Sequence, residues 1–166
     1  MDIDEVEDGL RRAYGSLSRP AFGTVAGRLA RGPDGGLVEA LYDRFEVADV
    51  TDPNEDHGWH LILAADGRRW ALYVSAVGPY AALARISQAW DLILTPDTED
   101  PAPDERWLLD LLAGRGLTVL SQADLETPVA LALTGVDDVR AYHALFTATE
   151  ILPWDHVTLR RLGLLA

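Results

Sequence analysis

The amino-acid sequence predicts an α+β fold: a single domain, residues 1–166, with N-terminal helices, a central antiparallel β-meander and helices packed on one face of that sheet. Three observations support this prediction. Apolar residues recur at helical spacing over residues 3–14. Two apolar runs flank Asp66-Gly67, a dipeptide typical of two-residue β-hairpins. A chain of 166 residues also has the length of one domain with a normal core.

Residues 1–31 are expected to form a helical N-terminal segment. The helix over 3–14 has acids in its first turn and arginines in its last, an arrangement that suits the helix dipole. A second helix is predicted from Ser18, as its N-cap, to a position before Gly32. The residues expected to point inward from this second helix are Phe22, Val25 and Leu29.

Residues 37–95 are expected to form the β-rich sheet. The strongest element is a hairpin in which 57–65 pairs with 69–76 about Asp66-Gly67. In this register His60 lies across from Tyr73, since side chains alternate between faces. One face would carry Trp59, Leu61, Leu63, Trp70, Leu72 and Val74. Segments 81–86 and 89–96 are further strands, whereas 37–45 is either strand or helix, with strand favoured.

Residues 100–166 are expected to contain a helix and further strands. Asp100 is placed as the N-cap of a helix that ends near Gly114, and acids at its start favour the positive end of the dipole. A short strand over 117–120, a capped turn over 121–126 and another strand over 128–133 follow. Segment 139–146 is either strand or helix, with strand preferred, and the apolar C-terminal tail should dock on the body.

Composition excludes several classes of function. The sequence has no cysteine and no lysine, which removes thiol nucleophiles, zinc-thiolate sites, Schiff-base lysines and phosphate-binding P-loop lysines. A net charge of −13 disfavours binding to the phosphate backbone of nucleic acids. The acidic N-terminus does not resemble a signal peptide, and no apolar run has the length of a membrane span. A cytoplasmic protein that binds neither membranes nor nucleic acid is expected.

The stretch DPNEDHGWHL, residues 52–61, contains the most suggestive polar cluster. His57 and His60 are three residues apart, so on one extended strand they point to opposite faces and cannot share a metal ion. No metal and no other cofactor is therefore expected. His60 and His143 are the two histidines that could be functional, although a structural role is the more common one for a single histidine beside aromatic residues.

The charge balance leads to the functional hypothesis. An acidic, cysteine-free α+β domain suits a non-catalytic protein-binding module, such as a bacterial immunity or antitoxin-type inhibitor of a basic, toxin-like partner. The carboxylates expected to bind that partner are Asp52, Glu55, Asp56, Asp97, Glu99 and Asp100. The alternatives are a small hydrolase-like enzyme that uses histidine and carboxylates in a cleft beside the sheet, and a housekeeping interaction protein. The oligomeric state stays open.

Overall fold

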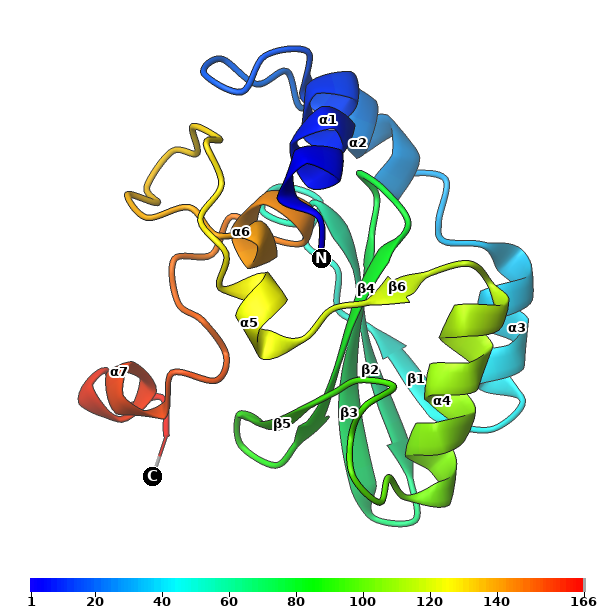
Figure 1. Ribbon diagram of the computed structural model, residues 1–166. Helices are drawn as coiled ribbons and strands as arrows, with labels where there is room; N and C mark the ends of the chain where they lie inside the picture. Colours follow the sequence, from blue (N-terminus) through cyan, green and yellow to red (C-terminus); the bar gives the residue numbers. More distant parts are fainter. Residues whose placement is uncertain (166) are drawn as a thin grey trace.

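The fold is organised around an antiparallel sheet, which the computed structural model describes over residues 1–165 (Figure 1). Five strands lie side by side in chain order: β1 (Glu46–Asp49), β2 (Gly58–Ala65), β3 (Arg68–Ser75), β4 (Tyr80–Ile86) and β5 (Trp90–Leu94). A short sixth strand, β6 (Thr118–Val119), runs parallel to the beginning of β4. This order confirms the α+β class and the predicted meander.

The hairpin of β2 and β3 has the predicted register. Ala65 is opposite Arg68, and His60 is opposite Tyr73. The two loop residues both take positive φ, 49° at Asp66 and 74° at Gly67, as a type I′ turn requires. The turn chemistry and the apolar alternation therefore fix the same pairing.

Replacing Gly67 with valine should lower the free energy of unfolding by about 1–3 kcal/mol, because a β-branched residue resists the positive φ of this turn. Chemical denaturation measures the change. Asp66→Asn is a matched control, since asparagine tolerates positive φ, and this variant should unfold as the wild type does. Equal stability of Gly67→Val and the wild type would show that the turn relaxes without cost.

Helices cover both faces of the sheet, which differs from the prediction that they pack on one face. One face is covered by α1 (Ile3–Tyr14), α2 (Gly23–Leu29), α5 (Gln122–Leu125) and α6 (Ala141–Leu145). The other face is covered by α3 (Gly35–Tyr42) and α4 (Pro103–Gly114), seen at the right of Figure 1. The reason lies in β3, whose last six residues are all buried and so offer apolar side chains to both faces.

Two segments that were open between strand and helix, with strand favoured, contain helices. Segment 37–45 falls mostly in α3, where Asp34 accepts the N–H of Leu37 at 2.8 Å and caps the helix. Leu37 and Leu41 are buried at a spacing of four, which is helical. Segment 139–146 contains α6 rather than a strand. All five residues of this short helix are buried, so the segment lacks the alternation of buried and exposed residues that is typical of a strand with one solvent-facing side.

Two helix boundaries and one predicted strand also differ. The second helix begins at Gly23, not at Ser18, and the side chain of Phe22 is 39% exposed instead of inward. The helix expected from Asp100 begins at Pro103, which occupies its first turn. Segment 128–133 has only isolated bridges at Pro128 and Leu133, so it is not a strand.

A buried carboxylate joins α4 to the sheet. Glu105 has no exposed surface, and its two oxygens accept both guanidinium hydrogen bonds of Arg85, each at 2.8 Å. The indole Nε1 of Trp70 donates to Glu105 at 3.1 Å, and the backbone N–H of Ala102 donates to it at 2.9 Å. This one side chain therefore anchors the start of α4 to β3 and β4.

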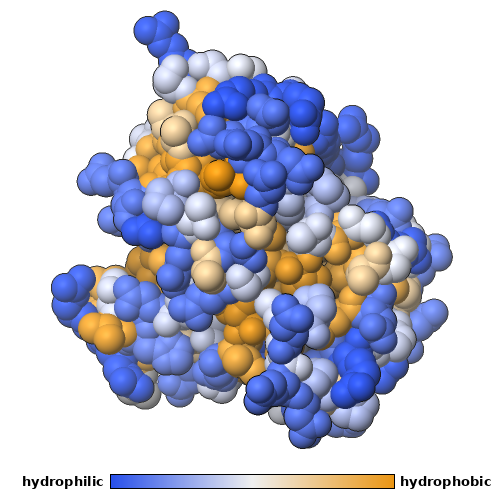
Figure 2. Space-filling view, in the orientation of Figure 1, coloured by the Kyte–Doolittle hydropathy of each residue, from blue (hydrophilic) through white to orange (hydrophobic). Residues whose placement is uncertain are grey.

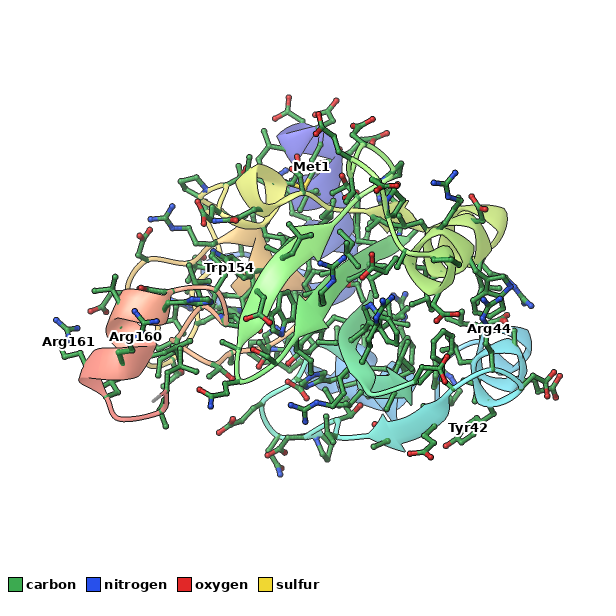
Figure 3. All side chains as sticks on the ribbon, turned by 90° about the horizontal axis from the view of Figure 1, so that it is seen from below. Met1, Tyr42, Arg44, Trp154, Arg160 and Arg161 are labelled. Atoms are coloured by element: carbon green, nitrogen blue, oxygen red, sulfur yellow. The ribbon has the colours of Figure 1, made fainter. Side chains whose placement is uncertain are left out.

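The two edges of the sheet differ. At the β5 edge the N–H of Trp90 donates to the carbonyl of Pro153 at 3.2 Å, and Nε2 of His156 lies 3.2 Å from the carbonyl of Trp90. His156 begins the last helix, α7 (His156–Arg161), which stands at one end of the molecule (Figures 1 and 3). At the opposite edge, within residues 1–165, β1 pairs with β2 alone.

Hydrophilic residues cover most of the face shown in Figure 2, with apolar residues visible between them. Of the helices in residues 1–165, none combines the length and the apolar character that a membrane crossing requires.

Candidate functional site

The β1 edge has an unusual concentration of carboxylates. Acids recur at every third position from Asp43 to Glu55, and all of them are exposed: Asp43, Glu46, Asp49, Asp52 and Glu55. In the described part of the chain, none of the five forms an ion pair with an arginine. Residues 32–67 contain nine acids and one arginine, Arg44, which is bound to Asp104 at 2.6 Å. The negative charge of this edge is therefore not neutralised within the protein.

Two exposed apolar side chains flank the strand. Tyr42, before β1, is 58% exposed, and Val50, after it, is 47% exposed. Figure 3 shows Tyr42 at the border of the molecule, next to the beginning of β1. We call Tyr42, Asp43, Glu46, Asp49, Val50, Asp52 and Glu55 the β1 edge surface. Sequence reasoning missed Tyr42, Asp43, Glu46, Asp49 and Val50, although the three-residue spacing of the acids was available as a signal.

The loop after β1 is held by its own polar groups and by a distant segment. The N–H of Asn54 donates to the carboxylate of Asp52 at 2.9 Å. The N–H of Ala148 donates to the carbonyl of Glu55 at 2.7 Å, which fastens the loop to the chain beyond α6. The carboxylates of Asp52 and Glu55 thus stand on a backbone that is ordered before any partner binds.

Asp56 lies inside the loop and does not contribute to the surface. Its side chain is 8% exposed and accepts the N–H of Asp52 at 2.7 Å. Burial raises the pKa of the Asp56 carboxyl, and hydrogen bonds at the loop partly oppose that rise. Of the three acids proposed in this stretch, Asp52 and Glu55 are therefore available to a partner, whereas Asp56 shapes the loop.

The second acidic stretch lies in the segment between β5 and α4. Register places Asp49, Leu61, Leu72, Leu83 and Leu94 in one row across the five strands. Four strand spacings separate the ends of β1 and β5 by about 19 Å. The exposed residues Asp97, Glu99 and Asp100 lead to the start of α4, which contacts the chain before β1, whereas Asp52 and Glu55 follow the other end of β1. Farther along, Asp104 forms an ion pair with Arg44, and Glu105 forms one with Arg85.

His60 lies on the sheet face that carries α6. Its ring stacks on Tyr73 with centroids 4.0 Å apart, as the register predicted. Burial lowers the pKa of His60 to about 4. Its Nε2 atom is buried and has no hydrogen-bond partner among residues 1–165. His60, Tyr73 and Trp90 line an open apolar groove of about 310 Å³ beside the C-terminal segment.

His57 and His143 are buried and bind backbone. Nδ1 of His57 lies 3.0 Å from the carbonyl of His143, so this nitrogen carries the proton that it donates. Nδ1 of His143 accepts the N–H of Arg140 at 2.9 Å, so this ring is neutral with its proton on Nε2. Burial lowers the pKa of both imidazoles. Both rings therefore have structural partners that hold them in the neutral form.

His57 departs from the expected alternation. It precedes β2, and its N–H donates to the carbonyl of Phe146 at 2.6 Å. Its ring packs against Tyr14 and Phe22, so it lies on the side of α1 instead of opposite His60. The two imidazoles still have separate partners, and in the described residues no group of three or more His, Asp or Glu side chains gathers closely enough to hold a metal ion.

The histidines do not form a recognisable catalytic arrangement. Within residues 1–165 no histidine ring hydrogen-bonds to a carboxylate or a hydroxyl; the side-chain bonds of His57, His143 and His156 are all to backbone atoms. A cavity of about 470 Å³ brings His143 near Glu150 and Asp155. The carboxylate of Asp155, however, caps α7 by accepting the N–H of Thr158 at 3.0 Å.

The chain was compared with known proteins at three levels. It matches no protein-family model, and no curated protein and no solved structure is significantly similar to it. The geometry of the β1 edge surface is therefore the feature that indicates a function.

Proposed function

We propose that this protein is a non-catalytic binding module of the bacterial immunity or antitoxin type, and that it acts in the cytoplasm on a basic protein partner. The observation that carries the proposal is the β1 edge surface, where five exposed carboxylates form no ion pair with any group of residues 1–165. A concentrated field of one sign accelerates the encounter with a partner of opposite charge.

Two further features support this surface. Binding energy in protein interfaces concentrates on a few large side chains surrounded by charge, and Tyr42 with Val50 supplies apolar contacts among the acids. The loop that carries Asp52 and Glu55 is already ordered, which reduces the entropy lost on binding. The arginines of α7 point away at the opposite end of the molecule (Figure 3), so they do not offset this field.

The charge of the β1 edge can be reversed without disturbing the fold. In the triple variant Asp43→Arg, Glu46→Arg, Glu55→Arg, all three replaced side chains are exposed, so the melting temperature should change little. Asp52 is left unchanged because its carboxylate accepts the N–H of Asn54 and orders the loop. Asp56 is left unchanged because it is buried. The triple variant should associate with the basic partner at least about tenfold more slowly at low salt, and the rate should depend less on salt.

The matched control is Asp97→Arg, Glu99→Arg, Asp110→Arg, which changes the net charge equally at exposed positions outside the β1 edge surface. Proteins from the native host that bind the wild type and the control, but not the edge variant, would be identified and their association rates measured against salt. If the edge and control variants lose binding equally, net charge alone determines binding and the proposed surface is wrong.

A further inference from the structure

Two backbone hydrogen bonds show which residues of β1 point their N–H and C=O groups toward β2 and which point them outward. The N–H of Val50 donates to the carbonyl of His60 at 2.9 Å, and the N–H of Ala76 donates to the carbonyl of His57 at 3.0 Å. In an antiparallel sheet, successive residues of a strand direct their backbone groups to alternate neighbours. Even-numbered residues of β2 therefore bond to β1, and odd-numbered residues bond to β3.

The same alternation assigns each residue of β1. Glu46 and Ala48 are an even number of positions from Val50, so their backbone N–H and C=O groups also point toward β2. Val47 and Asp49 direct their N–H and C=O groups outward, and within residues 1–165 these four groups have no hydrogen-bond partner. In Figure 3, β1 forms the lower border of the molecule with no strand or helix beyond it. The outer side of β1 is therefore an open strand edge.

The charges on this edge indicate what it can accept. Side chains alternate along β1, so Glu46 is on one face of the sheet and Asp49 on the other. An added strand with basic residues would meet a carboxylate on either face, and opposite charges on neighbouring strands stabilise a sheet. A second copy of this chain would instead bring two acidic edges together, which is unfavourable. Tyr42 and Val50 mark the two ends of the open strand.

We propose that an extended, arginine- or lysine-rich segment of the partner adds to the sheet as a further strand beside β1, bonded to the backbone of Val47 and Asp49. This inference rests on the proposed function but goes further, because simple electrostatic docking does not need backbone hydrogen bonds.

A pair of peptides separates strand addition from charge attraction. The probe is a seven-residue peptide of alternating arginine and valine, and its control is the depsipeptide in which ester links replace the central amides. The two have the same charge and side chains, but the control lacks the N–H donors of the central links. The amide peptide should bind the full-length protein at least about tenfold more tightly at low salt, and it should protect the N–H groups of Val47 and Asp49 from hydrogen exchange measured by NMR.

A variant tests the same edge from the protein side. Val47→Pro removes an outward N–H and no bond to β2, and proline is tolerated at a strand edge that faces solvent. The Val47→Pro variant should bind the amide peptide no more tightly than the wild-type protein binds the depsipeptide. Val47→Ala, which also loses the valine packing but keeps the N–H, should retain the preference for the amide peptide.

Equal binding of the two peptides, no binding of either, or unprotected amides at Val47 and Asp49 would overturn strand addition. If the protein forms a dimer at low salt that protects these amides without peptide, the strand that pairs with β1 is a second copy of this chain, and the proposal of a basic segment is wrong. The charge-reversal experiment tests the proposed function separately, since it measures association with the natural partner. Charge-dependent binding there, combined with equal binding of the two peptides, would leave the function standing without this mode of binding.

Discussion

Replacing Glu105 with alanine should lower the free energy of unfolding by about 3–5 kcal/mol, the largest loss expected for any single substitution considered for this protein. The carboxylate is fully buried and receives hydrogen bonds from Arg85, Trp70 and Ala102. Its loss leaves the indole N–H of Trp70 and the backbone N–H of Ala102 without an acceptor in the core, and each unsatisfied group carries a desolvation penalty. Chemical denaturation at neutral pH measures the change.

The pKa of Glu105 explains why the carboxylate stays ionised. Burial by itself would raise this pKa, but the hydrogen bonds from Arg85, Trp70 and Ala102 outweigh burial and hold it at about 2. Glu105→Gln keeps the shape and one acceptor oxygen, so it should lose clearly less stability than alanine. A double-mutant cycle with Arg85→Met isolates the ion pair. If alanine and glutamine cost the same, the effect comes from lost charge and not from the unsatisfied donors.

Acidification from pH 7 to pH 5 should destabilise the protein, and His60 alone should account for about 2 kcal/mol of that loss. Burial lowers the pKa of His60 from the ordinary value of 6.5 to about 4. Between these values the unfolded chain binds a proton that the folded chain does not. The stability is therefore complete above pH 6.5 and decreases as the pH falls. His57 and His143, whose pKa values burial also lowers, act in the same direction.

The matched variant is His60→Phe, which keeps a ring on Tyr73 but cannot titrate. Denaturation curves of both proteins at pH 7 and pH 5 give the difference, and the pH dependence of the variant should be smaller by about 2 kcal/mol. Asp56 has the opposite effect, because burial raises its pKa and the folded form then takes up a proton as the pH falls. An unchanged pH dependence in His60→Phe would show that this imidazole is hydrated in the folded protein.

Local patterns predicted the parts of the fold that depend on local chemistry. The hairpin, its register and the stacking of His60 on Tyr73 follow from Asp66-Gly67 and the alternation around it. Segment 37–45 was ambiguous because Leu37, Leu41 and Phe45 suit both a four-residue and a two-residue period, and only packing against the sheet decides between them. The second helical layer could not be predicted either, since it follows from the burial of β3 on both sides.

The acidic loop was found in the sequence, but the surface around it was not. Asp52 and Glu55 are exposed as predicted. Asp56 is buried because its carboxylate turns inward and accepts the N–H of Asp52, which closes the turn. The separation of Asp97, Glu99 and Asp100 from this loop depends on which end of β1 the start of α4 contacts, which no local pattern contains. Tyr42 and Val50 look like ordinary core residues in the sequence, and only their exposure distinguishes them.

The bonds between the C-terminal segment and Trp90 have a consequence for the growth of the sheet. Because Pro153 and His156 occupy backbone groups of β5, that side of the sheet is partly closed, whereas β1 stays open. A sheet with two open sides can act as a template in both directions and polymerise into fibres. A protein whose sheet has one open side can pair edge to edge with at most one other copy of itself. The C-terminal segment thus opposes open-ended polymerisation of this chain.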